Sequence, residues 1–308
     1  MTKSLLEKQI ELSNMVIEAG KFLIKNNLVA RTWGNISCRL PLSNNFIITP
    51  SGKAYENLQP EDLCLLNADC KSLEFLNCKV LKPSSEKKLH SIIYQKRSDI
   101  NFIIHTHQPF ASAMSLAGEA SSGYPTAKYA LPGTDELANY VGNKIATDTD
   151  VILMHGHGTV ILGKDYRSAM ELSMKLEREC RAAFLAEYLP TGITDGSIDF
   201  STEQIHVSND KRIKVKSPIV DLFSKQLLPA YIDDFSQIFG SEVEIDNSSF
   251  YFSNTDIEEI QAAALVVYKN CLGAVVAQQS GEMPISAEDC KLMHNKYVNS
   301  YSKEMFSE

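Results

Sequence analysis

The sequence lacks the features of a disulfide-bonded secreted protein. It contains seven cysteines, an odd number, and no two of them stand in a C-x-x-C spacing. This count and spacing argue against a disulfide framework and against a zinc knuckle built from thiolates. The N-terminal segment also lacks the apolar core and the small-residue cleavage site of a signal peptide. We therefore expect reduced cysteines and a cytoplasmic protein.

Long apolar runs and an excess of positive charge are also missing. No uninterrupted apolar stretch approaches the length of a membrane span. The formal net charge is −8, which argues against a general nucleic-acid binder and against association with an anionic membrane surface. We expect neither nucleic acid nor a membrane as a partner. An anionic substrate would have to be held by local hydrogen-bond donors.

The residues that are present predict an α/β protein. With 44% hydrophobic and 22% charged residues, the composition is that of a globular protein with a sizeable core. Apolar positions at helical spacing, short β-branched runs and turn residues alternate through the first 190 residues. The expected helices are 3–27, 83–97, 108–117, 134–146 and 166–188, and the expected strands are 36–40, 45–49, 62–67, 72–77, 102–104, 151–154 and 159–163.

The chain after Pro190 is predicted to form a second unit. Residues 191–217 are polar and carry glycine, serine and aspartate, as a linker does. Residues 218–308 are expected to form helix, strand, strand, helix and helix, with the first helix over 227–240. A similar order of helices and strands is expected in residues 131–188, so the C-terminal segment repeats it at an offset of about 90 to 97 residues. We therefore predict a catalytic domain over 1–190, a linker over 191–217 and a smaller C-terminal α/β partial repeat over 218–308, without metal ligands.

Two H-x-H pairs follow apolar strands. His105 and His107 come after 102–104, and His155 and His157 come after 151–154. Residues i and i+2 of a strand point to the same face, so each pair can project together from a strand end. Three imidazoles plus an open position are the pattern of a catalytic zinc site. The two pairs therefore predict a metal centre, in which geometry alone leaves open whether His155 or His157 is the third ligand.

Three short segments rich in small polar residues fit an anion site. Turns of this kind present backbone N–H groups in a concave nest, and a helix start adds its free N–H groups and its dipole. Each segment alone equally fits an ordinary turn or a helix cap. The residues are Gly34, Asn35, Ser51, Gly52, Ser84 and Ser85. Glu86 follows the serine pair, and beside a metal this carboxylate gains a role in acid/base catalysis.

Six motifs in this order resemble the class II aldolase/adducin family. The motifs are "RTWGNIS", "ITPSGK", "KPSSE", "IIHTHQPFASA", "LPGTDELA" and "ILMHGHGTVILGKD". The resemblance covers about residues 5–190 and is strongest to sugar-phosphate aldolases of the L-fuculose-1-phosphate aldolase type. It implies a three-layer α/β sandwich around a mainly antiparallel central sheet. It also implies a homotetramer with its site near a subunit interface.

The resemblance implies a zinc-dependent retro-aldol enzyme that cleaves a small ketose phosphate into dihydroxyacetone phosphate and an aldehyde. It assigns the metal ligands to His105, His107 and His157, with His155 as a neighbour, and Mn²⁺ or Co²⁺ as alternatives to Zn²⁺. It assigns the acid/base role to Glu86. It assigns the substrate phosphate to Gly34, Asn35, Ser51, Gly52, Ser84 and Ser85.

Three alternatives remain at this stage. Pentulose-phosphate 4-epimerases of the family use the same metal site, but they carry aspartate after the two serines, so Glu86 favours the aldolase. Dehydratase relatives act on methylthioribulose phosphate. A non-catalytic assembly module of the adducin type would have lost ligands that this chain retains.

The catalytic tyrosines of the family have no secure counterpart in this sequence. Tyr124 and Tyr129 lie in the region of the interface tyrosine, where this chain is shorter. Tyr231 and Tyr251 are the candidates in the C-terminal segment.

Overall fold

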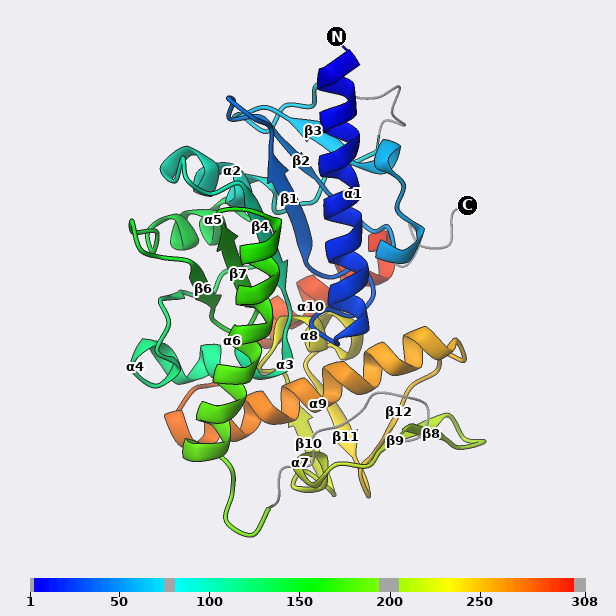
Figure 1. Cartoon of the computed structure of the whole chain (residues 1–308). Helices are drawn as coiled ribbons and strands as arrows, with labels where there is room; N and C mark the ends of the chain where they lie inside the picture. Colours follow the sequence, from blue (N-terminus) through cyan, green and yellow to red (C-terminus); the bar gives the residue numbers. More distant parts are fainter. Residues whose placement is uncertain (1–2, 75–80, 194–204, 302–308) are drawn as a thin grey trace.

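The centre of the protein is a seven-stranded sheet (Figure 1). The computed structural model describes residues 3–74, 81–193 and 205–301. The strand order is β3-β2-β1-β4-β7-β6-β5, and every neighbouring pair is antiparallel except β5 and β6. The strands are β1 (Asn35–Arg39), β2 (Phe46–Ile48), β3 (Cys64–Leu66), β4 (Phe102–Thr106), β5 (Thr126–Ala127), β6 (Val151–Met154) and β7 (Gly158–Gly163).

Helices cover both faces of this sheet. Strand residues alternate between two apolar clusters, so that Phe102 and Ile104 of β4 join one cluster and Ile103 joins the other. The first cluster includes α1 and α6, which lie in front of the sheet in Figure 1, and the second includes α2 and α5. The helices of this part are α1 (Lys3–Lys25), α2 (Lys87–Lys96), α3 (Pro109–Met114), α4 (Gly118–Ser122), α5 (Asp135–Gly142) and α6 (Tyr166–Glu187), with single turns at η1 (Tyr55–Asn57), η2 (Pro60–Asp62) and η3 (Ser115–Ala117). The predicted three-layer sandwich is confirmed.

Within its described residues, the C-terminal part adds two small antiparallel sheets, four α-helices and a π-helical segment. One sheet pairs β10 with β11, and the other has the order β12-β9-β8. Its elements are β8 (Ile205–Val207), β9 (Arg212–Val215), α7 (Pro218–Asp221), β10 (Gln226–Pro229), α8 (Asp233–Phe239), β11 (Glu242–Ile245), β12 (Ser249–Tyr251), α9 (Ile257–Ser280), α10 (Ala287–Lys296) and η4 (Tyr297–Tyr301).

Helix α9 joins the C-terminal part to the first sheet's helices. It crosses beneath the lower ends of α1 and α6 in Figure 1, and it packs against α3 and α8. By length and composition α9 is apolar enough to cross a membrane, which the sequence analysis did not anticipate. However, 94% of its most apolar window is buried inside the protein, as in a core helix.

Some predicted elements differ from the structure. Only the second half of the helix expected over 227–240 is helical. Gln226–Pro229 forms strand β10, which pairs with β11, and the helix begins only at Asp233. The helix expected from Pro83 begins after Glu86. Residues 205–215 of the expected linker contain β8 and β9. Residues 194–204 of the linker and the end of the strand expected at 72–77 lie outside the described residues. The domain boundaries and the partial repeat stay predictions.

Candidate functional site

Three imidazole rings converge in the interior beside the central sheet. Nε2 of His105 lies 3.1 Å from Nε2 of His107 and 3.0 Å from Nε2 of His157. All three residues are at most 3% exposed. The two H-x-H motifs therefore contribute to one buried group, with His157 and not His155 as the third member.

Strand pairing brings the two motifs together. His105 is the fourth residue of β4, and it pairs with Asn35 of β1 on one side and with Val160 of β7 on the other. Strands β6 and β7 form a hairpin whose turn contains His157. Gly156 in this turn has a φ of +63°, a left-handed conformation that glycine adopts without the steric cost of a Cβ. The hairpin thus places His157 next to the end of β4.

The spacing of the donor atoms fits a divalent cation. Four ligands at zinc–nitrogen distances of about 2.0–2.1 Å lie about 3.3 Å from one another at the corners of a tetrahedron. The imidazole contacts of 3.0 and 3.1 Å are close to this value. Two oxygens of Glu86 complete the group, because Oε2 lies 3.1 Å from Nε2 of His105 and Oε1 lies 3.3 Å from Nε2 of His157. The buried histidine group is therefore consistent with a metal site.

Each ring has an oxygen near its other nitrogen. Nδ1 of His105 is 2.9 Å from the main-chain carbonyl of Thr159. Nδ1 of His157 is in ion-pair contact with Asp233, and Nδ1 of His107 lies 3.5 Å from Oδ2 of Asp234. Oxygens in these places favour a proton on Nδ1, which leaves Nε2 free to bind a metal.

Glu86 is held beside the rings by the last turn before α2. Its backbone N–H donates to Oγ of Ser84 at 3.2 Å, and its side chain is 8% exposed. Oε2 accepts a 2.7 Å hydrogen bond from the amide of Asn35. Burial alone would raise the pKa of Glu86, but the neighbouring rings of His105 and His157 hold this pKa well below its ordinary value. The group is therefore a carboxylate at neutral pH.

The protonation of the rings follows from their neighbours. Burial would lower the pKa of His157, but the carboxylates of Asp233 and Glu86 outweigh this effect and raise the pKa to about 10. Burial, the neighbouring rings of His105 and His157 and the ammonium group of Lys269 hold the pKa of His107 well below its ordinary value.

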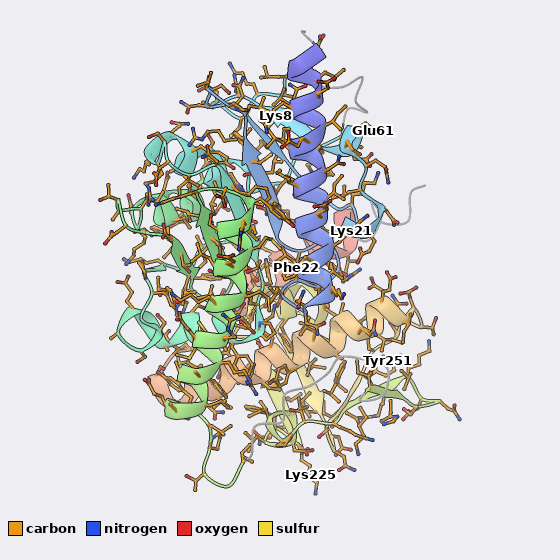
Figure 2. All side chains as sticks on the ribbon, viewed as in Figure 1. Lys8, Lys21, Phe22, Glu61, Lys225 and Tyr251 are labelled. Atoms are coloured by element: carbon orange, nitrogen blue, oxygen red, sulfur yellow. The ribbon has the colours of Figure 1, made fainter. Side chains whose placement is uncertain are left out.

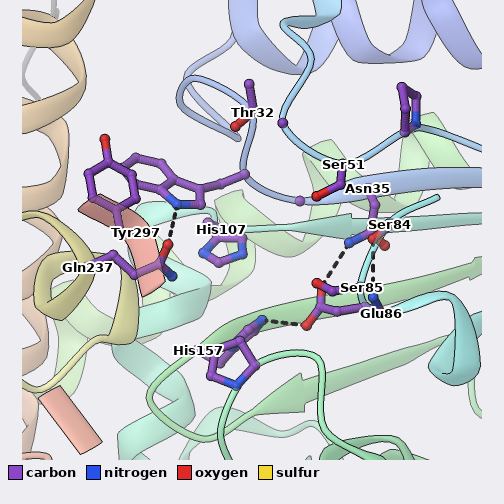
Figure 3. Close-up of a pocket in the computed structure, with 15 residues that line it drawn as sticks. Thr32, Asn35, Ser51, Ser84, Ser85, Glu86, His107, His157, Gln237 and Tyr297 are labelled. Carbon is purple, nitrogen blue, oxygen red and sulfur yellow. Dashed lines mark hydrogen bonds and ion pairs between the residues drawn. The ribbon is translucent and has the colours of Figure 1, made fainter. Parts of the chain in front are cut away.

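The residues predicted to bind phosphate line one pocket with the histidines. The close-up in Figure 3 shows Asn35, Ser51, Ser84 and Ser85 on the side of the pocket nearest Glu86. All six predicted residues line this pocket, together with Glu86, His107 and His157; the six are Gly34, Asn35, Ser51, Gly52, Ser84 and Ser85. Lys53, which follows Gly52 in the sequence, is not among the residues that line the pocket. Its ammonium group pairs with Asp62 at 2.6 Å.

Glycine allows the first turn of the pocket to approach β4. Gly34 has a φ of +73°, and a Cβ at this position would lie 2.4 Å from the main-chain oxygen of His105. Any side chain would therefore push the turn away from β4, which carries His105.

The C-terminal part forms another wall of the pocket. In Figure 3, Gln237 and Tyr297 face the pocket beside His107. The ring of Tyr297 stacks on Trp33 with centroids 6.4 Å apart, and the indole N–H of Trp33 donates to Oε1 of Gln237 at 2.8 Å. Trp33 was not assigned from the sequence although it lies in the motif "RTWGNIS". Gln237 and Tyr297 were not predicted either, because nothing in their local sequence marks a binding site.

The remaining candidates lie apart from the histidine group. Nε2 of His155 is 3.5 Å from Glu282, and the hydroxyl of Tyr124 contacts Glu179 on the surface. Tyr251 is 56% exposed and lies at the outer end of the C-terminal part (Figure 2).

The other two tyrosine candidates, Tyr129 and Tyr231, lie closer to the histidine group. The main-chain oxygen of Tyr231 lies beside Gly156. The hydroxyl of Tyr129 is buried without a hydrogen-bond partner among the described residues, and burial together with the charge of Asp233 raises its pKa.

Comparison with known proteins agrees with this geometry. The family described as "Class II Aldolase and Adducin N-terminal domain" matches residues 14–184. The chain is 31% identical over 184 residues to a 5-deoxy-D-ribulose 1-phosphate aldolase from Bacillus thuringiensis serovar kurstaki, covering 56% of this chain and 83% of that protein. It is 26% identical over 205 residues to the L-ribulose-5-phosphate 4-epimerase UlaF from Salmonella paratyphi A, covering 59% of this chain and 88% of that protein.

A solved structure shares the fold. An L-fuculose 1-phosphate aldolase aligns with a TM-score of 0.51 and 24% identity, over 59% of this chain and 91% of its own length. The match to the family covers more than half of the sequence and includes every residue of the histidine group and of the predicted phosphate-binding turns. The chain belongs to the class II aldolase and adducin N-terminal domain family.

Proposed function

We propose that the protein is a metal-dependent aldolase that cleaves a small ketose phosphate into dihydroxyacetone phosphate and an aldehyde. The observation that carries this proposal is the convergence of three buried imidazole Nε2 atoms and the Glu86 carboxylate in one pocket. The names of the similar proteins support a sugar phosphate as the substrate.

His105, His107 and His157 would hold the metal. Bound Zn²⁺, or Mn²⁺ or Co²⁺ in its place, supplies Lewis-acid stabilisation of the negative charge that develops on the ketose fragment as the carbon–carbon bond breaks. The three rings are fixed through their Nδ1 contacts, so their Nε2 atoms need little rearrangement to bind a cation.

Glu86 is the proposed acid/base group. Retro-aldol cleavage removes a proton from the hydroxyl on the carbon beyond the breaking bond and returns a proton to the carbon that keeps the electron pair. Glu86 is buried in the pocket next to His105 and His157, and its low pKa leaves it able to accept the first proton.

Neutral donors would hold the substrate phosphate. The described lining of the pocket contains no lysine or arginine, whereas it contains the turns at Gly34, Ser51, Gly52, Ser84 and Ser85. Backbone N–H groups and hydroxyls in such turns bind phosphate without a full positive charge. A phosphate fixed there would keep the reacting carbons at a constant distance from Glu86.

The second candidate is a pentulose-phosphate 4-epimerase. The similarity to a 4-epimerase favours it, since the same bond cleavage followed by rotation and recombination would invert one carbon. The glutamate at position 86 favours the aldolase, because the epimerases of the family carry aspartate there. A non-catalytic assembly module is disfavoured by the complete histidine group.

The deciding experiment combines metal analysis with a substrate panel. We expect about one divalent ion per chain, lost in His105→Ala and retained in the matched control His155→Ala, because His155 does not join the buried group. The metal-loaded protein is then incubated with dihydroxyacetone phosphate and short aldehydes. Acetaldehyde is included because a five-carbon deoxyketose phosphate would release a two-carbon aldehyde.

The outcomes separate the candidates. We expect condensation with at least one aldehyde, and Glu86→Gln should lower its rate by about 10²- to 10⁴-fold. Interconversion of pentulose phosphates without any condensation would favour the epimerase. A metal-free protein of unchanged stability would favour the assembly module. We also propose a cytoplasmic homotetramer, for which light scattering should give four times the chain mass.

A further inference from the structure

Two buried carboxylates of the C-terminal part face the rings of the candidate metal centre. Asp233 and Asp234 are the first two residues of α8, and both are completely buried. Asp233 is in ion-pair contact with Nδ1 of His157, and Oδ2 of Asp234 lies 3.5 Å from Nδ1 of His107. The match to the family ends at residue 184, so both carboxylates come from outside the matched region.

A purely structural role does not account for Asp233. The dipole at a helix start favours a carboxylate only weakly, whereas burying a charge is costly unless the charge is compensated. Among the described residues, the ion pair that Asp233 forms is with the ring of His157. The compensation for this charge therefore comes from the histidine group.

Lys269 of α9 completes this arrangement. Its Nζ is in ion-pair contact with Asp234 and donates to the main-chain carbonyl of His107 at 3.1 Å. The C-terminal part thus contacts both the ring and the main chain of His107. In the same way, the N–H of Asp233 donates to the carbonyl of Gly156 at 2.8 Å, one residue before His157.

We propose that Asp233 and Asp234 are positioning residues of the metal centre. Their carboxylates accept hydrogen bonds from the protonated Nδ1 of His157 and His107 and thereby present Nε2 of both rings to a divalent cation. His105 has an equivalent partner within the matched domain, the carbonyl of Thr159. This inference rests on the proposed metal site and extends it, because it makes the C-terminal part a component of that site.

Charge supports the same assignment. Asp233 and Asp234 bring two negative charges and Lys269 brings one positive charge, so the C-terminal part adds a net charge of −1 beside the rings. A negative charge behind the imidazole ligands strengthens their binding to a cation.

The test measures zinc affinity on the full chain by competition with a chromophoric chelator. Asp233→Asn and Asp234→Asn keep the volume and remove the charge, and each should weaken zinc binding by about 10- to 100-fold. The Co²⁺-loaded variants should also show a shifted visible spectrum, since the ligand geometry changes. A loss of packing alone would not move that spectrum while the protein remains folded.

Glu259→Gln is the matched control. Glu259 is also a buried carboxylate of the C-terminal part, but it pairs with Arg31 at 2.6 Å and not with a histidine ring. This variant should retain the zinc affinity and the Co²⁺ spectrum of the wild type. A folded Asp233→Asn with both properties unchanged would overturn the positioning role, whereas a wild type that binds no zinc would overturn the proposed metal centre itself.

A measurement on the unmodified chain covers the case in which an aspartate variant does not fold. Nitrogen NMR of the zinc-loaded protein identifies which nitrogen of each ring carries the proton. We expect a proton on Nδ1 of both His107 and His157. A metal-bound Nδ1 on His157 would contradict the inference.

Discussion

The side-chain amide of Asn35 donates a 2.7 Å hydrogen bond to Oε2 of Glu86, and this contact fixes the carboxylate beside the imidazoles. The other end of the amide, Oδ1, contacts Nε2 of His90. Burial lowers the pKa of His90 to about 3, so the ring is neutral at pH 7 and carries a single proton. Because Oγ of Ser37 lies 2.7 Å from Nδ1, a proton on Nε2 satisfies both contacts.

Asn35→Asp should impair turnover without removing the metal. The substitution keeps the shape of the side chain but replaces the donor that faces Glu86 with a second carboxylate. Loss of a hydrogen bond to a charged group costs about 1.5–3 kcal/mol, which corresponds to roughly a 10- to 100-fold lower kcat/KM. The measurement is kcat/KM together with the zinc content of the same preparation. Unchanged kcat/KM would show that Glu86 does not depend on Asn35.

Lys269→Met should destabilise the metal-free protein strongly. Lys269 is 1% exposed and forms its ion pair with Asp234, which is completely buried. Removing one partner of a buried pair leaves the other charge uncompensated, at a cost of about 3–5 kcal/mol. Equilibrium urea unfolding measures this loss. The double variant Lys269→Met/Asp234→Asn should recover part of it, and a single variant within 1 kcal/mol of the wild type would be contrary to this account.

The histidine group could be predicted from the sequence because its signals are local. Each H-x-H pair follows an apolar strand, and strand alternation predicts that both rings of a pair lie on one side. This holds for His105 and His107, whereas His155 and His157 lie in the turn after β6 and only His157 joins the group. The spacing alone left His155 and His157 open, and the family resemblance selected His157. The structure agrees, since the turn at Gly156 directs only His157 into the group.

The contribution of the C-terminal part could not be predicted in this way. Asp233 and Asp234 look like ordinary acidic residues in the first turn of a helix, which are favourable for dipole reasons alone. One signal was available in α9, where Lys269 and Asn270 interrupt an apolar stretch that runs from Ala262 to Ala277. A lysine in such a place needs a buried partner, but the sequence does not say which one.

Stability should fall with rising pH because of Glu177. Its carboxylate accepts hydrogen bonds from the N–H groups of Phe110 and Ala111 at 3.0 and 3.1 Å, at the start of α3. Burial raises the pKa of Glu177 to about 7, from an ordinary value of 4.5. The folded state therefore holds the proton more tightly than the unfolded state, so the free energy of unfolding decreases as the pH rises from about 4.5 to 7.

Glu177→Gln isolates this effect, because the amide does not titrate. We expect the wild type to lose on the order of 2 kcal/mol relative to the variant between pH 5 and 8, since one pKa unit corresponds to about 1.4 kcal/mol. Urea unfolding at several pH values gives both curves. Parallel curves, or a wild type that gains stability relative to the variant, would contradict the raised pKa.

Trp33 should report the binding of a phosphate compound by its fluorescence. It is the single tryptophan of the chain, so the emission of the protein is assigned to one side chain. It lines the pocket next to Gly34, stacks on Tyr297 and donates to Gln237. A ligand that binds at the turns of the pocket therefore changes the surroundings of the indole ring, and titration with dihydroxyacetone phosphate should give a saturable change in emission.

Two tyrosine variants control this measurement. Tyr297→Ala should shift the emission to longer wavelength by exposing the ring of Trp33 to water. Tyr251→Phe, which alters an exposed tyrosine of the C-terminal part, should leave the emission unchanged. If dihydroxyacetone phosphate is consumed in the condensation assay but the emission of Trp33 stays constant at saturating concentrations, the phosphate binds elsewhere than in this pocket.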